Sequence, residues 1–472
     1  MNRIIVIDPL TRIEGHAKIS IYLDDSGMVS DARFHVTEFR GFERFCQGRP
    51  LAEMPGITAR ICGICPVSHL LASSKSADKI LSVAIPVSAQ KLRRLLNLAQ
   101  IIQSHALSFF HLSSPDFLLG WESDIAKRNI FGLMEANPEV ARAGIRLRQF
   151  GQGIIELLAG RKIHANWSVP GGVLTCLSAE GKDWIGERIA ESLHTIEMAL
   201  DLFKKLLDKQ FSQEVEVFGN FPSLFMSLVG QQGQWEHYDG KIRFVDSNSN
   251  IVSDNLSEDD YPQFIGESVE SWSYLKFPYY RPWGYPNGIY RVGPLARLKV
   301  CQYIGSELAD REFREFRSRS GNSSFYYHYA RLIEILACLE KIQDLIEDQD
   351  LYSDRLRSQA GINQLEAVGV SEAPRGTLFH HYQVDKNGLI AKVNLIIATG
   401  QNNLAMNKTI AEIAKHYIKG CAQIPESLLN RVEAGIRCYD PCLSCSTHAI
   451  GQMPLQIELI DANGAIVGEI SR

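Results

Sequence analysis

The sequence predicts an α+β fold that is mainly α-helical: a bundle of long helices with small sheets at its periphery. Three patterns lead to this prediction. Apolar residues recur at three- and four-residue spacing over long stretches, most clearly in residues 182–208, as they do in amphipathic helices. Near the N-terminus apolar and polar residues alternate, which is typical of strands. In residues 211–300 aromatic, glycine, proline and turn residues dominate, which indicates strands and loops.

Strands are expected in the first part of the chain, residues 1–45. Ile4–Ile7 is a short apolar run, and residues 17–22 alternate between apolar and polar side chains. Residues 24–27, Asp-Asp-Ser-Gly, are typical of a turn between two strands. We therefore expect a small sheet at the N-terminus.

Helices are expected to form the bundle in residues 86–210 and 325–448. The first begins near residue 86 and is expected to end at Pro115, because proline often ends a helix. The segment between the two helical parts, 211–300, is expected to be a strand-and-loop insertion, and residues 1–448 to form one compact unit. The remaining helices are expected at 137–160, 182–208, 325–348, 404–419 and 426–436.

The composition is that of an ordinary globular protein, with 45% apolar and 22% charged residues. A formal net charge of −5 provides no electrostatic argument for binding nucleic acid or an anionic membrane. We expect a cytoplasmic protein, since no signal-peptide pattern opens the sequence and no apolar run approaches the roughly 20 residues of a transmembrane helix. Ten cysteines are few for 472 residues, and six of them are scattered singly, which fits reduced thiols.

The other four cysteines form two C-x-x-C pairs near opposite ends of the chain, Cys62/Cys65 and Cys442/Cys445. Each pair brings two thiols to one side of a tight turn, so the two pairs could supply four soft ligands if the fold brings them together. Structural zinc sites use similar pairs, but usually about 15–20 residues apart. Thioredoxin-like redox chemistry would leave one pair unexplained, and disulfides would need an oxidising compartment.

Further motifs accompany the two pairs. The sequence contains Arg12-Ile13-Glu14-Gly15-His16, then Arg40-Gly41-Phe42-Glu43, then the first pair with Pro66 and His69 after it. Towards the C-terminus it contains Glu372-Ala373-Pro374-Arg375-Gly376, and the second pair lies between Asp440-Pro441 and His448. These five motifs, in this order, resemble those of the large (catalytic) subunit of nickel–iron hydrogenases. Within that family the chain is similar to the hydrogen-activating subunit of the bidirectional, NAD(P)-linked type of cyanobacteria.

The resemblance implies a nickel–iron centre. Cys62 and Cys442 would be terminal ligands of nickel, and Cys65 and Cys445 would bridge nickel to an iron that carries cyanide and carbon monoxide. Pro374 and Arg375 would lie over the two metals, with Asp116 and Asp440 holding Arg375. The hydroxyl of Thr399 would bind a cyanide, although Ala398 replaces the usual proline beside it. Glu14 would accept the proton released from dihydrogen.

The resemblance also implies a magnesium site, with Glu43, the carbonyl of Leu395 and His448 as ligands, which suits a hard cation that prefers oxygen. Without the resemblance, these motifs have plainer interpretations. Arg12 and Glu14 would pair with each other, Glu43 would be a solvated carboxylate, Asp116 a turn residue, and Arg375 an exposed turn arginine.

The expected activity is reversible heterolytic cleavage of H₂, coupled to NAD(P)⁺ through other subunits. The chain contains no nucleotide-binding fingerprint and no further cysteine cluster, so electrons would leave through a small subunit with an iron–sulfur cluster and a flavin-containing diaphorase module. The alternatives are a hydrogenase with a deazaflavin or ferredoxin acceptor, a non-catalytic hydrogen sensor, and the quinone-site relative of respiratory complexes. The four cysteines and Glu14 argue against that last relative. A zinc-stabilised binding protein remains if the resemblance is set aside.

Residues 449–472 are expected to be a propeptide. In the resembling family a nickel-dependent endopeptidase removes such a tail after the histidine that matches His448, once chaperones have inserted the metals. The tail itself, with apolar stretches on both sides of Asp461-Ala462-Asn463-Gly464, predicts a β-hairpin. We expect this hairpin to keep Cys442 and Cys445 away from the first pair until nickel arrives.

Overall fold

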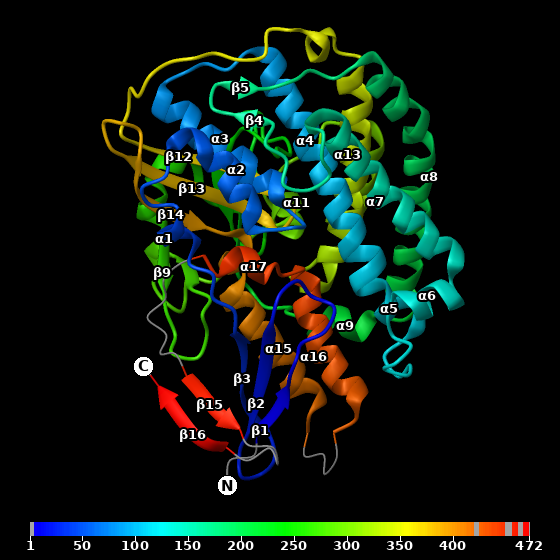
Figure 1. The fold of residues 1–472 in the computed structure, drawn as a ribbon. Coiled ribbons are helices and arrows are strands. Elements are labelled where there is room, and N and C mark those ends of the chain that lie inside the picture. The colour runs from blue at the N-terminus through cyan, green and yellow to red at the C-terminus, as the bar shows by residue number, and fades with distance from the viewer. Residues whose placement is uncertain (1–3, 420–423, 449–455, 461–465, 472) are drawn as a thin grey trace.

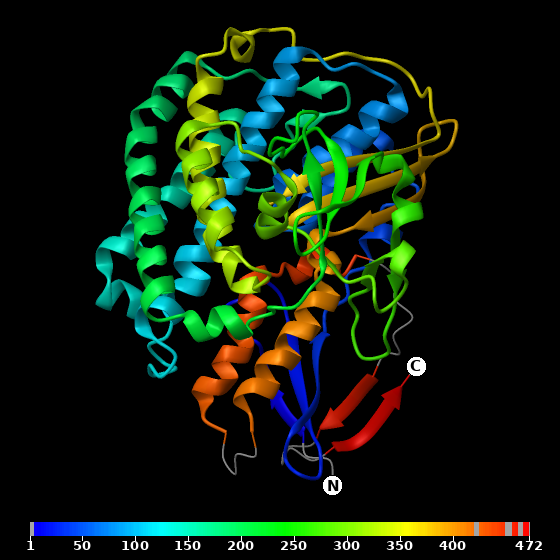
Figure 2. The ribbon, with the colours of Figure 1, turned by 180° about the vertical axis from the view of Figure 1, so that it is seen from behind.

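The structure, a computed structural model, describes residues 4–419, 424–448, 456–460 and 466–471. As predicted, long helices dominate it and the sheets are small. Figures 1 and 2 show the helical bundle on one side and a three-stranded sheet on the other, with the short helix α17 (Leu443–Ser446) between them. Within these described ranges no helix is long and apolar enough to cross a membrane.

The N-terminal sheet forms as the alternating pattern predicts. Strands β1 (Ile4–Ile7), β2 (Ala17–Leu23) and β3 (Val29–Val36) are antiparallel in the order β1-β2-β3. Ile19, Ile21 and Phe34 are fully buried, and strand β3 packs on helix α15 (Asn403–Tyr417). Since α15 belongs to the last part of the chain, this contact joins the two ends of the protein.

Four long helices make the bundle: α4 (Val87–Ala106), α7 (Pro138–Ala159), α8 (Ala179–Lys209) and α13 (Tyr327–Ile346). Helix α4 packs on α7 and α13, and α8 packs on α13. Helix α13 is apolar on nearly every side and therefore lies buried in the interior. The shorter helices on this side are α5 (Ser114–Leu119), α6 (Ile130–Ala136), α9 (Ser212–Val217) and α12 (Glu307–Arg319).

The expected helix end at Pro115 is wrong. After α4 the backbone continues through a π-helical turn, Leu107–Ser113, directly into α5. Pro115 lies in the first turn of α5, a position at which proline is common in helices. The same helical run therefore carries Asp116 to a buried position instead of a turn.

The middle segment consists of short strands and loops, as predicted. Strands β6 (Leu224–Val229), β7 (Lys241–Val245), β8 (Ile251–Leu256) and β11 (Tyr290–Arg291) form a sheet in the order β11-β6-β7-β8. The segment ends in helix α11 (Pro294–Val300), which packs against β6. Smaller elements here and nearby are β4 (Ser168–Val169), β5 (Gly172–Val173), α10 (Tyr261–Phe264), β9 (Ile265–Ser268) and β10 (Phe277–Tyr280).

The segment 366–396, predicted to belong to the helical bundle, is instead an antiparallel sheet. Strands β12 (Glu366–Ala373), β13 (Gly376–Val384) and β14 (Ile390–Ile396) follow one another through tight turns. Ten of the first eleven residues of this sheet, 367–373 and 376–378, are buried, so the apolar–polar alternation that marks an exposed strand is missing. Helix α3 (Pro66–Leu81) covers β12.

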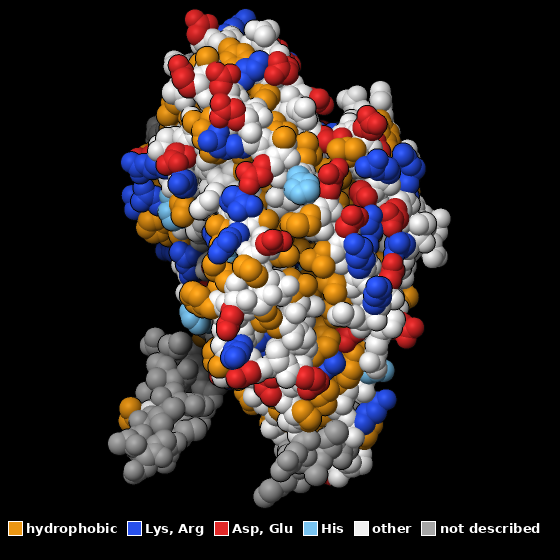
Figure 3. Space-filling view, turned by 90° about the vertical axis from the view of Figure 1, so that its right-hand side faces the viewer, with side chains coloured by type: hydrophobic (Ala, Val, Ile, Leu, Met, Phe, Trp, Pro, Cys, Tyr) orange, Lys and Arg blue, Asp and Glu red, His pale blue; other side chains and the backbone are white. Residues whose placement is uncertain are grey.

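The remaining described elements surround the sheet or close the chain. They are α1 (Phe42–Phe45), α2 (Met54–Thr58), α14 (Ala398–Gln401), α16 (Glu426–Tyr439), β15 (Gln456–Ile460) and β16 (Ile466–Ser471). Strands β15 and β16 pair antiparallel, so the predicted hairpin forms; its expected turn at 461–464 lies outside the described residues. On the face seen in Figure 3, positive and negative side chains are interspersed.

Burial of His105 predicts a pH-dependent stability. Its ring lies on α4, fully buried, with Nε2 2.8 Å from Glu334 Oε2, and burial lowers the pKa of His105 to about 4. Between pH 6.5 and 4 the unfolded chain therefore binds a proton at this residue that the folded chain does not, so stability falls as the pH falls. At pH 4.5 this one group should cost roughly 2–3 kcal/mol.

Chemical denaturation at pH 6.5 and 4.5 tests this prediction. The His105→Gln variant should lose part of the difference in stability between the two pH values, whereas His194→Gln, at an exposed histidine of α8, is the matched control. An equal pH dependence in wild type and His105→Gln would contradict it.

Candidate metal centre

The structure brings the two cysteine pairs together. Sγ of Cys62 lies 3.2 Å from Sγ of Cys442, and Sγ of Cys65 lies 3.3 Å from Sγ of Cys445. All four sulfur atoms lie within 4.8 Å of one another, and all four residues are buried free thiols. Four buried thiols at this spacing are a ligand set for soft transition metals.

Local backbone structure aims the sulfur atoms. Each pair lies at the start of a helix: Cys65 comes immediately before Pro66, the first residue of α3, and Cys442 immediately before α17, which contains Cys445. The backbone N–H groups of Ile64 and Cys65 point at Sγ of Cys62, at 3.2 and 3.3 Å. Hydrogen bonds from the neighbouring thiols, first of all Cys442, lower the pKa of Cys62, whereas burial raises the pKa of Cys442 and Cys445.

An arginine lies beside the clustered thiols. Arg375, 3% exposed, lines one small cavity with Cys65, Cys442 and Cys445. Its Nη2 atom lies 3.0 Å from the carboxylate of Asp440, and its Nε atom donates to the carbonyl of Asp440. Burial alone would lower the pKa of Arg375, but the charge of Asp440 and the nearby thiols raise it. The arginine is therefore a permanent buried cation at this cavity.

The expectation that Asp116 holds Arg375 is wrong. The carboxylate of Asp116 lies 2.5 Å from Nη2 of Arg12 and 3.0 Å from Nε of Arg437, and it also accepts from the amide of Asn430. Its two arginine partners outweigh the effect of burial and lower the pKa of Asp116. Asp440, the residue after α16, is the carboxylate that pairs with Arg375. Asp116 instead joins the N-terminal segment to α5 and α16 through Arg12 and Arg437.

Glu14 lies beside the second cysteine pair. Its carbonyl accepts the N–H of Leu443 at 3.1 Å, and the backbone forms an isolated bridge with Cys442. Its carboxylate accepts the N–H of Ser444 at 3.1 Å and the hydroxyl of the same serine. Arg12 is paired with Asp116 and not with Glu14, so the plain interpretation of Arg12 and Glu14 as an ion pair is wrong.

The three residues expected at the magnesium site also meet. Glu43 Oε1 lies 3.0 Å from Nδ1 of His448 and accepts the N–H of Leu395 at 2.8 Å. Burial would raise the pKa of Glu43, but His448 lowers it, so the carboxylate is charged. A buried carboxylate beside an imidazole is compatible with a hard cation.

Thr399 lines the same cavity as Arg375. Pro374 comes immediately before Arg375 in the turn between β12 and β13. The hydroxyl oxygen of Thr399 accepts the N–H of Cys442 at 3.0 Å, which leaves its proton free to donate.

Sequence reasoning missed a chain of buried side chains behind Cys445. His69 Nε2 lies 3.4 Å from Sγ of Cys445, and its Nδ1 lies 3.1 Å from Nε2 of His380. His380 continues to the hydroxyl of Tyr382 at 2.6 Å, which donates to Ser73 at 2.9 Å. Burial lowers the pKa of His69 to about 4. The uncharged ring of His69 therefore packs against Cys445 on the buried side of the site, and His380 packs behind it.

The expectation that the tail holds the second pair away is wrong. The structure includes β15 and β16, yet the four sulfur atoms are already together and His448 already contacts Glu43. Backbone bonds explain this, since the carbonyls of Thr447 and His448 accept the N–H groups of Arg40 and Glu43. These bonds fix the chain up to His448, whatever follows it.

This fold and site define a nickel-dependent hydrogenase large subunit, and the chain belongs to that family. The family model described as nickel-dependent hydrogenase matches residues 40–125 and 238–448, and one described as HoxL-like matches residues 4–39. The family establishes an oxidoreductase that acts on H₂.

The relatives agree in sequence and in structure. The chain is 42% identical to NAD-reducing hydrogenase HoxS subunit beta of Cupriavidus necator over the whole of both chains. It is 41% identical to the corresponding polypeptide of the F420-non-reducing hydrogenase of Methanothermobacter marburgensis over 99% of each chain. A crystal structure of an NAD⁺-reducing [NiFe]-hydrogenase in the H₂-reduced state matches with a TM-score of 0.92 at 44% identity, over 94% of this chain and 99% of that chain.

Metal binding by the isolated chain should depend on the clustered cysteines alone. Cobalt(II), used as a probe, should give thiolate charge-transfer absorption with the full-length protein. Cys442→Ser should weaken cobalt binding by about tenfold or more. Cys438, which is fully buried four residues earlier with a pKa raised to about 12 by burial, supplies the control variant Cys438→Ser. Wild-type cobalt affinity in Cys442→Ser would contradict the assignment.

Proposed function

We propose that this chain is the catalytic subunit of a bidirectional [NiFe] hydrogenase that exchanges electrons with NAD(P)⁺/NAD(P)H through partner subunits. The observation that carries the proposal is the group of four buried thiols under the Arg375–Asp440 ion pair. The similarity to an NAD-reducing relative over the full length supports the choice of electron acceptor.

The thiols fit the proposed cofactor. Cys62 and Cys442 would bind nickel as terminal ligands, and Cys65 and Cys445 would bridge it to an iron carrying cyanide and carbon monoxide. Sulfur–sulfur distances of 3.2 Å (Cys62–Cys442), 3.3 Å (Cys65–Cys445) and 3.0 Å (Cys442–Cys445) support a compact metal centre held by all four thiols. When bound, such a centre supplies the electron-rich metal pair on which dihydrogen is split heterolytically.

The residues around the cavity would orient and stabilise the reacting groups. The guanidinium of Arg375, fixed by Asp440, places a buried positive charge and donors at the open side of the cavity. Pro374, next to Arg375 in the turn between β12 and β13, would contribute to cofactor binding, and the free hydroxyl proton of Thr399 would donate to an iron ligand. Few water molecules fit in so small a cavity, which strengthens these interactions.

Glu14 would accept the proton. Its carboxylate is half-buried beside Ser444, two residues after Cys442, so a proton leaving a thiol of the second pair has a nearby base. The hydroxyl of Ser444 holds the carboxylate in place. Behind the site, Glu43, Leu395 and His448 would bind magnesium and fix the C-terminal segment to β14.

The chain would work with a small subunit that carries an iron–sulfur cluster and with a flavin-containing diaphorase module. A second candidate uses an acceptor other than NAD(P)⁺, such as a deazaflavin or ferredoxin. The relatives that are 41% identical are F420-non-reducing, and because F420 is a deazaflavin they favour ferredoxin within this second candidate. The chain would act in the cytoplasm, a reducing compartment in which cysteines remain thiols that can bind metal. A nickel-dependent endopeptidase, acting after metal-insertion chaperones, would remove residues 449–472.

Infrared spectroscopy and turnover together test the proposal. The chain, produced with its maturation proteins and partner subunits, should show stretching bands of iron-bound cyanide and carbonyl and should reduce NAD(P)⁺ with H₂. Bands with H₂-dependent reduction of artificial dyes, but not of NAD(P)⁺, would favour the second candidate. Zinc in place of nickel, with no bands, would contradict the hydrogenase assignment.

Replacement of Glu14 should separate proton transfer from assembly. Glu14→Gln keeps the shape and acceptor oxygen but cannot take a proton, so nickel and iron content should be normal and H₂ turnover lower by about 10²–10⁴-fold. Glu14→Asp, which keeps a titratable group, should recover part of the turnover. Normal turnover in Glu14→Gln would rule out Glu14 as the proton acceptor.

A further inference from the structure

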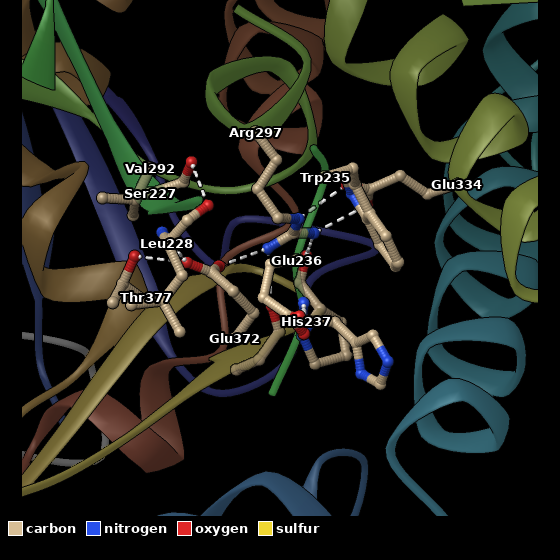
Figure 4. Close-up of polar contacts among 12 residues, drawn as sticks. Ser227, Leu228, Trp235, Glu236, His237, Val292, Arg297, Glu334, Glu372 and Thr377 are labelled. Atoms are coloured by element: carbon tan, nitrogen blue, oxygen red, sulfur yellow. Dashed lines mark hydrogen bonds and ion pairs between the residues drawn. The ribbon is translucent and has the colours of Figure 1, made fainter. Parts of the chain in front are cut away.

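A fully buried cluster of charges lies next to the metal centre without belonging to it. Arg297 of α11 extends between Glu334 of α13 and Glu372 of β12, as Figure 4 shows. All three side chains are excluded from solvent. Burying an ion pair costs desolvation free energy that its mutual attraction does not always recover, so a cluster of this kind needs a reason beyond stability.

Arg297 uses every donor that it has. Its Nε and Nη2 atoms bind the two oxygens of Glu334, both at 2.6 Å, and Nη1 binds Glu372 at 2.7 Å. The two remaining N–H groups donate to consecutive backbone carbonyls, Ala373 at 2.9 Å and Pro374 at 3.1 Å. A guanidinium has five N–H donors in a fixed planar fork, and here all five are engaged.

Both carboxylates also accept hydrogen bonds from other donors. Glu334 also receives the indole N–H of Trp235 at 3.0 Å and contacts His105 at 2.8 Å. Glu372 also receives the backbone N–H of Leu228 at 2.9 Å and the hydroxyl of Thr377 at 2.7 Å. Because every polar atom of the two carboxylates has a partner, the cluster has one arrangement and is rigid.

The two carbonyls that Arg297 binds belong to the turn that carries Arg375. Ala373 ends β12, Pro374 follows, and Gly376 begins β13. On the other side of this turn Gly293 lies so close that a Cβ atom there would be 2.7 Å from the carbonyl oxygen of Arg375. The turn is therefore fixed from two directions by the segment 293–297.

We propose that Arg297 is a positioning residue for H₂ chemistry: with Glu334 and Glu372 it fixes the turn 373–375 and so sets where the guanidinium of Arg375 lies over the four thiols. This inference rests on the role proposed above for Arg375. Lysine at position 297 would keep the charge but offer three donors on a flexible stem, so it could not bind both carboxylates and both carbonyls.

A double-mutant cycle on the metal-loaded complex with its partner subunits tests the inference. The variants are Arg297→Lys, Arg375→Lys and the double variant, with nickel content and H₂-dependent dye reduction as readouts. Arg297→Lys should keep its nickel and lose about tenfold or more of its turnover. In the Arg375→Lys background the same change should cost less than about twofold, because Arg297 acts through Arg375.

Arg93 supplies the matched control. It is another fully buried arginine, bound to the carboxylate of Asp78 at 2.6 Å and to the carbonyls of Val169 and Gly172 at 2.8 and 2.9 Å, with no contact to the turn 373–375. Arg93→Lys should lower the thermal midpoint as Arg297→Lys does while turnover per nickel stays normal. If Arg297→Lys cannot be produced as folded protein, Glu334→Gln weakens the ion pair of Arg297 on the side away from the turn. Its loss of turnover should likewise be smaller in the Arg375→Lys background than in the wild type.

A crystal structure of the Arg297→Lys protein gives a readout independent of activity. The contact between Nη2 of Arg375 and Asp440, 3.0 Å here, should lengthen or be replaced by a second conformer. Losses that simply multiply in the double variant, or an Arg375 that has not moved, would overturn the inference. Full turnover in Arg375→Lys would instead remove the proposed role of Arg375, and normal turnover in Arg297→Lys alone would leave that role intact and refute only the positioning role.

Discussion

The structure depends on one constraint: four thiols from opposite ends of the chain must meet in a buried pocket. Cys62 and Cys442 are 380 positions apart in the sequence, and their Sγ atoms lie 3.2 Å apart. The bridge of Glu14 with Cys442, the packing of β3 on α15 and the bonds of Arg40 and Glu43 to Thr447 and His448 all join the first part of the chain to the last. The helical bundle packs beside the site, and its helix α13 supplies Glu334 to the ion pair with Arg297.

Buried ion pairs fix the side of the pocket that Arg375 lines. Arg375 is paired with Asp440, and the turn that carries it is bound by Arg297. Asp116, Arg12 and Arg437 form a second buried network that secures the segment leading to Glu14. Removing one partner of a buried pair leaves a charge without compensation, which typically costs about 3–5 kcal/mol. The positions of the reactive groups are therefore fixed more firmly than hydrophobic packing alone would allow.

Periodicity in the sequence predicts the long helices and the N-terminal strands well, because their apolar positions face one side. It fails for β12 and the first half of β13, where nearly every residue is buried and the strand period disappears. The four cysteines could be predicted from motifs, since chemistry fixes residue type and spacing. The partner of Asp116 could not be predicted, because the tertiary fold determines which arginine lies close enough to form an ion pair. His380 and Tyr382 could not be predicted either, because their strand has no recognisable pattern in the sequence.

The closure of the two chain ends also has a consequence during synthesis. A ribosome adding about 5–20 residues per second needs roughly 20–80 s to proceed from Cys62 to Cys442. Throughout that interval the first pair is an incomplete binding site, open to oxidation or to an unsuitable ion. The complete four-thiol site can therefore bind metal only after the second pair has been synthesised.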